Sequence, residues 1–409
     1  MTTMANDISQ SVMNIGTLGH IDHGKTSLVK ALTHQWTDRH SESLKRNMTI
    51  KLGYADMVIR KCPKCEGASA YTTEGKCPSC GGPAEPLVRM SILDAPGHET
   101  LMATAISEAN IINALLFVIA SNENCPMQQT KEHLMIINLL GIKNVIIVQS
   151  KVDIVGKAKA MENYKQIKAF IKGSVIENAP IIPVMTNHNI NIDVLLEMIV
   201  KLPRPDPNPD AEPLMYIARS FDVNKPGIDA AKMQGGIIGG TLIRGTLKVG
   251  DKIEIRPGIN VAQPGKKEVY APIITVIGEI SNGFGTLQSA KAGGLIGIST
   301  EIDPAYTKAD GLVGNIAGMV GKLSAPAAAL SVKYHKLKRD DLPERAFTAG
   351  EPIIMSVGTA TVVGYIKKAK RDNLEVELKR PVVAEKGTKM AIMRNMSQRW
   401  RLTGYAIYG

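Results

Sequence analysis

The sequence predicts an α/β P-loop domain, with a parallel-rich sheet flanked by helices and a zinc-ribbon insertion, followed by two antiparallel β-barrels. Three observations support this prediction. Apolar runs alternate with helical patterns up to about residue 200, a proline-rich segment follows at 202–210, and period-two strands with glycine-rich turns fill the remainder. We therefore expect domains at 1–205, 206–325 and 326–409.

Short apolar runs in the first domain predict strands that are buried on both faces, as in a parallel sheet covered by helices. These runs lie at 12–17, 90–93, 115–120, 145–149 and 181–184. Helical patterns at 130–140 and 159–172 each end at a glycine, Gly141 or Gly173. In the segment 202–210, four prolines at alternate positions exclude a helix or a central strand and predict a stiff linker.

The second half has a different pattern. Residues 252–256 and 374–378 alternate between apolar and polar side chains, and Gly-Gly pairs punctuate the region. Short strands at this spacing predict antiparallel barrels rather than further βαβ units. A second break near 321–329 separates the two barrels.

The composition narrows the class of protein. The content of 44% hydrophobic and 21% charged residues argues against a disordered chain and against a membrane protein. Four of the five cysteines form two C-x-x-C pairs, which predict metal ligands in a reducing compartment and hence a cytoplasmic location. Residues 326–409 contain 16 Lys and Arg against 8 Asp and Glu, so they contribute +8 of the net charge of +11. This end would attract a polyanion, although a solvated basic surface explains the charge about as well.

The first motif lies between a predicted strand and a predicted helix. Residues 19–26 read GHIDHGKT and match the phosphate-binding pattern G-x-x-x-x-G-K-[ST]. Its glycines allow backbone N–H groups to surround a phosphate, Lys25 can reach the β- and γ-phosphates, and the Thr26 hydroxyl can bind Mg²⁺. The alternative, a glycine-rich turn without a ligand, fits this strand–loop–helix context poorly.

A second segment, 91–98, ends another predicted strand. Asp94 there could hold Mg²⁺ through water, and the Gly97 N–H could contact a γ-phosphate. The Asp-x-x-Gly pattern is weak alone but strong at this distance from the phosphate loop. Between the two motifs, Thr49 could complete the Mg²⁺ shell only when the γ-phosphate is present, which would define a nucleotide switch. By pattern alone, Thr49 could equally be a surface residue.

The tetrapeptide 150–153 follows the strand at 145–149. A carboxylate at Asp153 could accept two hydrogen bonds from the N1–H and N2–H₂ groups of guanine, which adenine does not offer. Considered in isolation, the tetrapeptide could also form a Lys–Asp surface pair.

The paired cysteines are Cys62 with Cys65 and Cys77 with Cys80, separated by eleven residues. Each pair can direct two thiolates at one point, and the two pairs complete a tetrahedral S₄ site suited to Zn²⁺. All four positions would be filled by protein, so the predicted ribbon at about 60–84 is structural rather than catalytic. Free or disulfide-bonded thiols are the less favoured alternative. Cys125 stands apart and is interpreted as a loop or core thiol.

With these motifs in place, nearly the whole chain resembles the gamma subunit of archaeal and eukaryotic translation initiation factor 2. The resemblance rests on the phosphate loop at 12–26, on the second-switch signature of translational GTPases at 94–98 and on the ribbon that precedes it. Residues 219–227 and 399–405 are also similar to this family. Elongation factor Tu resembles the same architecture but has no ribbon.

The resemblance implies a GTPase that hydrolyses GTP slowly without a partner and binds initiator methionyl-tRNA. It also implies a heterotrimer with alpha and beta subunits, delivery of the tRNA to the small ribosomal subunit, release on GTP hydrolysis, and no membrane contact. Its cofactors would be GTP or GDP, Mg²⁺ and structural Zn²⁺. His98 would orient the attacking water, and the Mg²⁺ site would comprise Asp22, Thr26, Asn47 and Thr49. The nucleotide-binding set would be Asp22, His23, Gly24, Lys25, Thr26, Ser27, Thr49, Asp94, Gly97, Ser150, Lys151, Val152, Asp153, Met185, Thr186 and Asn187.

Three positions depart from the family pattern. Ser150 replaces the asparagine of Asn-Lys-x-Asp, and loss of that amide would cost about 1 kcal/mol, a several-fold drop in affinity. Residues 185–187 replace Ser-Ala-Leu, where the family mainly uses a backbone N–H. Asn47 replaces a glycine.

Three other functions are compatible with some of these residues. A selenocysteine-specific elongation factor is the nearest alternative within the translational class. The altered base-binding residues would also suit a scaffold subunit with an impaired nucleotide site. A sulfate-activating GTPase shares the first two motifs, but the ribbon and residues 219–227 disfavour it.

Overall fold

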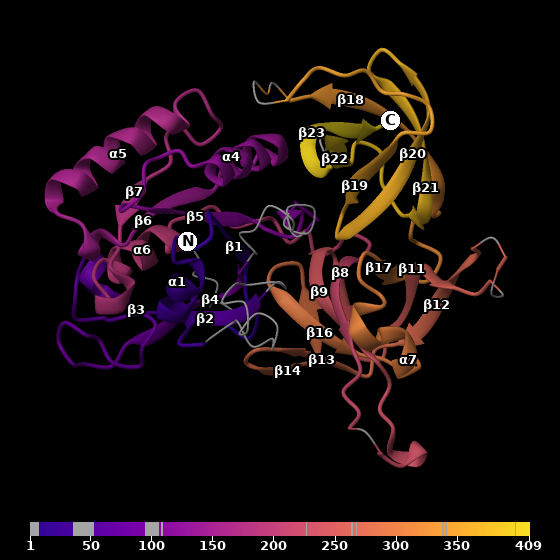
Figure 1. Ribbon diagram of the computed structural model, residues 1–409. Coiled ribbons are helices and arrows are strands. Elements are labelled where there is room, and N and C mark those ends of the chain that lie inside the picture. Colours follow the sequence, from indigo (N-terminus) through magenta and orange to yellow (C-terminus); the bar gives the residue numbers. More distant parts are fainter. Residues whose placement is uncertain are drawn as a thin grey trace. The chain divides into compact units, whose positions relative to one another are not determined.

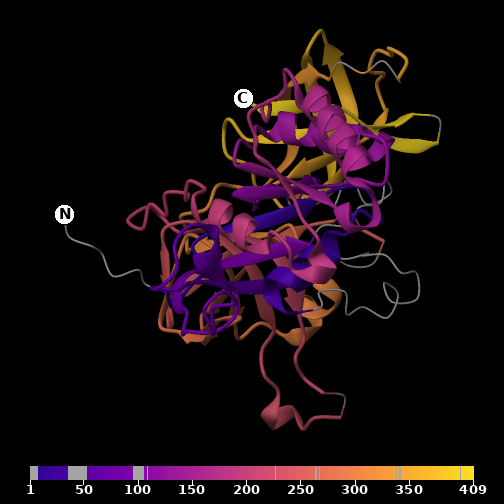
Figure 2. The same cartoon turned by 90° about the vertical axis from the view of Figure 1, so that its left-hand side faces the viewer.

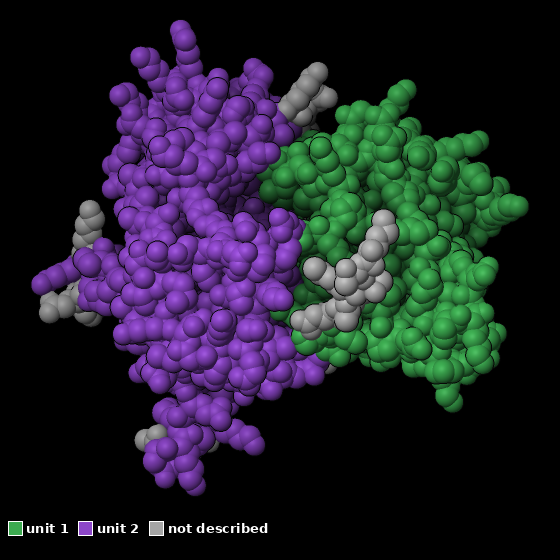
Figure 3. Space-filling view, turned by 180° about the vertical axis from the view of Figure 1, so that it is seen from behind, with its two compact units in different colours: residues 1–105, 112–205 green, residues 106–111, 206–409 purple. Residues whose placement is uncertain are grey.

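The computed structural model describes residues 8–35, 53–94 and 106–409, apart from positions 108, 226, 263, 264, 267, 338, 340, 341 and 397 (Figure 1). The chain forms two compact units, coloured separately in Figure 3. The first comprises Met1–Ala105 and Ile112–Pro205, and the second comprises Ile106–Ile111 and Asp206–Gly409.

The first unit is built on a seven-stranded sheet in the order β3-β2-β4-β1-β5-β6-β7. Strand β1 lies between β4 and β5 and is parallel to both, whereas β2 pairs with β4 in the antiparallel direction. All five strands predicted here are present, which confirms the parallel-rich sheet. The strands are β1 (Asn14–Leu18), β2 (Gly53–Lys61), β3 (Tyr71–Thr72), β4 (Glu85–Asp94), β5 (Ala114–Ala120), β6 (Val145–Ser150) and β7 (Ile181–Pro183).

Helices cover both faces of this sheet, and β5 is consequently buried along its whole length. Alternate residues of β5, such as Leu116 and Val118, share a core with Leu28 of one helix and Leu195 of another. Figure 1 shows α4 and α5 together on the other side of the strands. The helices are α1 (Lys25–Thr33), α4 (Gln128–Leu140), α5 (Lys157–Ile171) and α6 (Ile192–Val200), with short 3₁₀ turns η1 (Ala68–Ala70), η3 (Val152–Ile154) and η4 (Thr186–His188). Gly141 ends α4 in the left-handed conformation, as its position predicted.

The second unit begins with antiparallel strands that share one apolar core. Eight of them form a sheet in the order β12-β11-β17-β8-β9-β16-β13-β14, and β10 pairs with β15 in a separate ribbon. The strands are β8 (Leu214–Phe221), β9 (Ile237–Arg244), β10 (Thr246–Lys248), β11 (Lys252–Asn260), β12 (Tyr270–Val276), β13 (Glu279–Asn282), β14 (Gly285–Leu287), β15 (Ser289–Lys291), β16 (Leu295–Ser299) and β17 (Ile316–Met319). Three short helices accompany them: η5 (Ala230–Lys232), α7 (Pro304–Thr307) and η6 (Lys308–Asp310). The segment that contains η5 projects from these strands in both views (Figures 1 and 2).

The remaining strands form a closed barrel in the order β18-β21-β20-β19-β22-β23. Alternate residues of β18, Leu330, Val332 and Tyr334, point into its core. The barrel comprises β18 (Ala327–Lys336), β19 (Pro352–Val357), β20 (Ala360–Lys370), β21 (Asn373–Val382), β22 (Lys389–Met396) and β23 (Arg399–Tyr408). The predicted antiparallel structure is therefore present in both C-terminal domains, and closure is observed in the third. Among the described residues, no helix is long and apolar enough to cross a membrane.

Hydrogen bonds join the two β-domains within the second unit. The Thr359 hydroxyl donates to the Ile217 carbonyl at 2.8 Å, and Arg244 forms a bidentate pair with Glu385 at 2.6 and 3.1 Å. The short segment Ile106–Ile111 also belongs to this unit, because the Asn110 amide donates to the Gly358 carbonyl at 2.9 Å.

Candidate nucleotide site and metal centre

The loop between β1 and α1 has a backbone shape that the sequence encodes through its glycines. A Cβ atom at Gly19 would lie 2.3 Å from the Val118 carbonyl oxygen, so no other residue fits there. Asp22 and Gly24 adopt left-handed conformations, with φ of 61° and 88°. The helix α1 then begins at Lys25 without a side-chain cap. A helix N-terminus that follows such a loop offers backbone N–H groups and partial positive charge to a phosphate.

Lys25 is held inside this loop. Its side chain is buried, and Nζ donates to the carbonyl oxygens of Gly19 at 3.0 Å and His20 at 2.9 Å. Burial lowers the pKa of Lys25 to about 8, while the carboxylates of Asp94 and Asp22 oppose this shift. An anionic ligand at the loop would favour the charged ammonium in the same way as these carboxylates do.

Asp94 ends β4 beside this loop and is completely buried. Its Oδ2 accepts a hydrogen bond from the Thr26 hydroxyl at 2.8 Å, and its Oδ1 accepts one from the Thr17 hydroxyl at 2.9 Å. The structure thus brings together Lys25, Thr26 and Asp94. A carboxylate and a hydroxyl at this distance are the oxygen donors that Mg²⁺ prefers. Gly97, His98, Asn47 and Thr49 lie outside the described residues.

The predicted base-binding residues follow β6. Ser150 is buried, and its hydroxyl donates to the carbonyl oxygen of His23 in the phosphate loop at 2.6 Å. Lys151 then adopts a left-handed conformation, with φ of 56°, and the chain enters η3, which contains Val152 and Asp153. The Asp153 side chain is exposed. The serine hydroxyl is therefore directed at the phosphate loop and not at the exposed side of this segment.

The second base-binding segment begins at Met185. Met185 and Ile190 exchange two backbone hydrogen bonds of 3.2 Å, which close the turn that holds η4 with Thr186 and Asn187. Asn187 is exposed. Ser27 lies in the first turn of α1, next to Thr26.

Sequence reasoning missed a buried polar network around His23. The imidazole Nδ1 lies 3.1 Å from the Val118 carbonyl oxygen, and Nε2 lies 3.1 Å from Glu123 Oε2. Burial lowers the pKa of His23, opposed by the Val118 carbonyl and by Glu123. Asn163 of α5 and Gln149 of β6 continue the network. The only available signal was that polar residues follow β5 at the same sheet edge as the phosphate loop.

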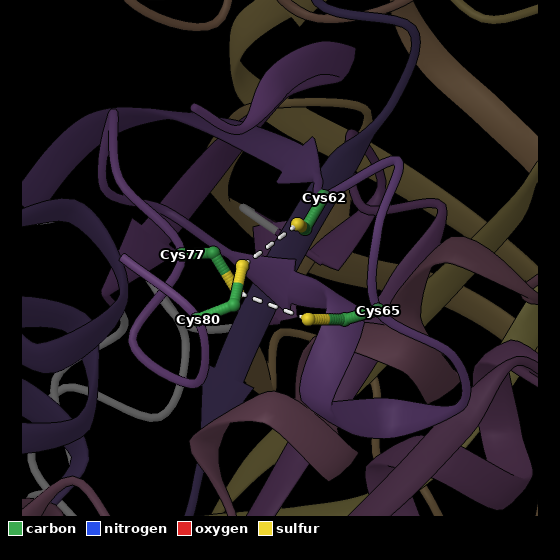
Figure 4. A group of neighbouring side chains, drawn as sticks. All are labelled: Cys62, Cys65, Cys77 and Cys80. Atoms are coloured by element: carbon green, nitrogen blue, oxygen red, sulfur yellow. Dashed lines mark hydrogen bonds between the residues drawn. The ribbon is translucent and has the colours of Figure 1, made fainter. Parts of the chain in front are cut away.

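The four paired cysteines lie together in the ribbon between β2 and β4 (Figure 4). Their sulfur atoms all lie within 4.8 Å of one another, with Cys62–Cys80 at 3.5 Å and Cys65–Cys77 at 3.7 Å. A Zn–S distance of about 2.3 Å in a tetrahedron requires sulfur atoms about 3.8 Å apart. The observed geometry therefore fits a structural Zn²⁺ ion. Cys125 lies outside this cluster and is buried, which raises the pKa of its thiol to about 12.

The chain is similar to known protein families and relatives over nearly its whole length. The Elongation factor Tu GTP binding domain family matches residues 10–205, and the family Initiation factor eIF2 gamma, C terminal, matches residues 329–408. The translation initiation factor 2 subunit gamma of Methanocaldococcus jannaschii is 49% identical over 402 residues, which cover 97% of each chain. The same subunit of Methanothermobacter thermautotrophicus is 47% identical over 407 residues, covering 98% of this chain and 99% of the relative.

Solved structures show the same fold at lower identity. A bacterial selenocysteine-specific elongation factor, EF-Sec, is 25% identical with a TM-score of 0.74, and the match covers 98% of this chain and 58% of that one. Elongation factor SelB of Methanococcus maripaludis, in complex with a GTP analogue, is 22% identical with a TM-score of 0.71, covering 97% and 79%. A GTPase domain of this family implies GTP or GDP and Mg²⁺ as ligands. On its identity to the archaeal relatives over nearly its whole length, the chain belongs to the family of translation initiation factor 2 gamma subunits, which are GTPases of translation initiation.

Proposed function

We propose that this chain is the GTP-switched carrier of initiator methionyl-tRNA and the core of a heterotrimer with alpha and beta subunits, and that it delivers the tRNA to the small ribosomal subunit. The family supports this proposal. The observation that carries it is the contact between Thr26 and Asp94, at 2.8 Å, because it places a hydroxyl and a carboxylate beside the phosphate loop. That is where a GTPase needs its magnesium ligands.

The chemistry of the residues around the phosphate loop suggests which of them would hold Mg²⁺ and which would contact the phosphates. Mg²⁺ supplies charge that neutralises the β- and γ-phosphates when it is bound. Thr26 would hold it with Asp22, Asn47 and Thr49, and Asp94 would act through water. Lys25 would exchange its carbonyl partners for phosphate oxygens.

Different residues would contact the γ-phosphate and the guanine base of the nucleotide. Gly97 would contact the γ-phosphate through its N–H group, and His98 would orient the attacking water. Asp153 would read guanine, with the segment 185–187 offering a backbone N–H. GTP hydrolysis would release the tRNA and would be slow in the absence of a partner.

The remaining assignments concern the whole chain. We infer a structural Zn²⁺ ion at Cys62, Cys65, Cys77 and Cys80, which the sulfur distances support. We also infer a cytoplasmic location and domains at 1–205, 206–325 and 326–409. The basic charge of the last domain supports contact with RNA, whose binding would weaken steeply with salt.

The proposal is tested by measuring the affinities of the purified chain for GTP, GDP and ATP with fluorescent analogues. We expect both guanosine nucleotides to bind and ATP to bind at least tenfold more weakly, because only guanine offers Asp153 two donors. Absence of guanosine binding at tens of micromolar nucleotide would instead indicate the scaffold subunit. Tight binding of selenocysteyl-tRNA in place of methionyl-tRNA would indicate the selenocysteine-specific elongation factor, although the 49% identity to initiation factor subunits disfavours it.

A further inference from the structure

Glu123 lies in the loop between β5 and α4, and its carboxylate contacts the phosphate loop from outside. Oε2 lies 3.1 Å from Nε2 of His23, whose side chain is 1% exposed, whereas that of Glu123 is 29% exposed. On the other side of the ring, Nδ1 faces the Val118 carbonyl oxygen at 3.1 Å. A carbonyl can only accept, so Nδ1 donates to Val118. The hydrogen bond between Nε2 and Glu123 therefore needs one further proton, carried by Nε2 or by the carboxyl group, and it holds the ring between two oxygen atoms.

The same glutamate is tied to the rest of the sheet edge. Its backbone carbonyl accepts from the Asn163 amide at 2.9 Å, and Asn163 Oδ1 accepts from Gln149 at 2.9 Å. The hydroxyl of Ser150, the next residue of β6, donates to the His23 carbonyl oxygen and so links β6 to the phosphate loop. These contacts form a closed circuit through β6, α5 and the phosphate loop. Asn163, Gln149 and Ser150 are all nearly inaccessible to solvent, so this part of the circuit is shielded from water.

We propose that Glu123 is a positioning residue for the phosphate loop and acts through His23. This inference rests on the proposed nucleotide-binding function. His23 stands between Asp22 and Gly24, both in left-handed conformations. A left-handed conformation is unfavourable for a residue that has a side chain, so the Asp22 backbone needs restraint from outside the loop. By fixing the intervening ring, Glu123 and Val118 hold this bend before a nucleotide binds, so that a phosphate meets N–H groups that are already oriented.

A purely structural role for Glu123 predicts a different result from a positioning role. A structural contact would contribute to the stability of the domain and leave nucleotide kinetics unchanged in the folded protein. A positioning contact would change the rate at which nucleotide leaves the loop, with little change in the melting temperature. The part-exposed carboxylate favours the second outcome, because water can satisfy Nε2 when the side chain is removed but does not fix the position of the ring.

The test measures dissociation of a fluorescent GDP analogue from the full chain by stopped flow. We expect Glu123→Ala to raise the dissociation rate about tenfold, the loss expected when one hydrogen bond to a buried group is removed. Glu123→Gln should stay within about threefold of the wild type, since an amide can either donate to or accept from Nε2. Glu162→Ala is the matched control, because Glu162 is exposed on α5 and should leave the rate unchanged.

A double-mutant cycle then decides whether Glu123 acts through His23. In a His23→Ala background, Glu123→Ala should change the rate by less than about twofold, since its partner is already absent. If His23→Ala does not fold, imidazole ¹⁵N resonances replace the cycle, and Glu123→Ala should shift the resonances of His23. An unchanged dissociation rate in Glu123→Ala, independent effects in the cycle or unshifted His23 resonances would overturn the inference. If the wild-type chain binds no guanosine nucleotide, the proposed function fails, and the resonances still report on the Glu123–His23 contact.

Discussion

The Thr26 hydroxyl and the Asp94 carboxylate are hydrogen-bonded at 2.8 Å although they lie 68 positions apart in the sequence. The parallel pairing of β1 with β4 causes this proximity, because it places Thr17, shortly before the phosphate loop, in register with Asp94 at the end of β4. Two motifs on neighbouring parallel strands thus meet at the carboxyl edge of the sheet, where open α/β sheets bind their ligands.

Asp94→Asn should weaken nucleotide binding in a magnesium-dependent manner. The substitution keeps the size of the side chain and removes the negative charge that would hold the hydrated ion. We expect at least a tenfold higher Mg²⁺ concentration for half-maximal tightening of GDP binding, measured by fluorescence titration. The exposed Asp210→Asn serves as the control for a change of one charge. Identical Mg²⁺ titrations for Asp94→Asn and the wild type would show that this carboxylate has no part in the magnesium site.

Ser150→Asn should strengthen guanosine binding. In the wild type, the Ser150 hydroxyl donates its single proton to the His23 carbonyl oxygen at 2.6 Å and so has none to donate to a base. An asparagine could keep the bond to the loop and offer a second N–H to guanine, for a gain of about 1 kcal/mol, or several-fold in affinity. Calorimetric titration with GDP measures this gain. Unchanged or weaker binding by a variant of normal stability would show that the serine costs the site nothing.

The zinc content of the protein should depend on the four clustered cysteines. We expect about one Zn²⁺ per chain by elemental analysis, because the four sulfur atoms lie within 4.8 Å of one another and match the four ligands of a structural zinc site. Cys62→Ser should lose most of this metal and make the ribbon susceptible to proteolysis, since the ribbon has little apolar core of its own. Cys125→Ser is the control and should keep the full zinc content. Equal zinc content in both variants would contradict the assignment.

The third domain contains a buried ion pair whose removal should be costly. Arg394 donates to the two Glu351 oxygens at 2.7 and 2.9 Å, and both side chains are 5% exposed. Glu351→Gln leaves the guanidinium without its countercharge and should lower the free energy of unfolding by about 3 kcal/mol. Denaturant unfolding of the full chain measures this loss. The exposed Glu375→Gln should change stability by less than about 0.5 kcal/mol.

The same pair predicts the direction of a pH dependence. Burial raises the pKa of Glu351, but the hydrogen bonds from Arg394 and the Thr348 N–H, together with the charges of Arg394 and Arg345, outweigh burial and hold the pKa below its usual range. The folded state therefore binds this proton less readily than the unfolded state. The stabilisation is present above the ordinary carboxyl pKa and disappears as the pH falls through the folded-state value. Acid titration should consequently destabilise the wild type more steeply than Glu351→Gln, and parallel curves would contradict this account.

The sequence predicted those parts of the fold that depend on local pattern. The apolar run at 115–120 is long and uninterrupted, so β5 was identified with nearly its observed ends. The alternation at 374–378 likewise identified β21. The strands of the last domain form a closed barrel, which leaves no strand edge unpaired, as the predicted antiparallel barrel requires. The open order of the eight-stranded sheet could not be predicted, because the pairing of β11 with β17 depends on chain closure over some sixty residues and not on local pattern.

The candidate site likewise contains residues that the sequence predicted and residues that it did not. The pattern G-x-x-x-x-G-K-[ST] identified Lys25 and Thr26 because each residue type is required by phosphate chemistry. Glu123 was not identified, since a single glutamate in a loop has no signature and acquires its meaning only when Nε2 of His23 lies 3.1 Å away. The direction of the Ser150 hydroxyl was equally inaccessible, because it depends on a contact with a residue 127 positions distant.

The central claim is that the bound nucleotide controls the binding of initiator methionyl-tRNA. Filter binding of that tRNA to the purified chain, loaded in parallel with a non-hydrolysable GTP analogue and with GDP, tests the claim most directly. The account predicts at least tenfold higher affinity with the analogue, because only the γ-phosphate can order the segments that contact it. Equal affinities in the two nucleotide states would contradict the account.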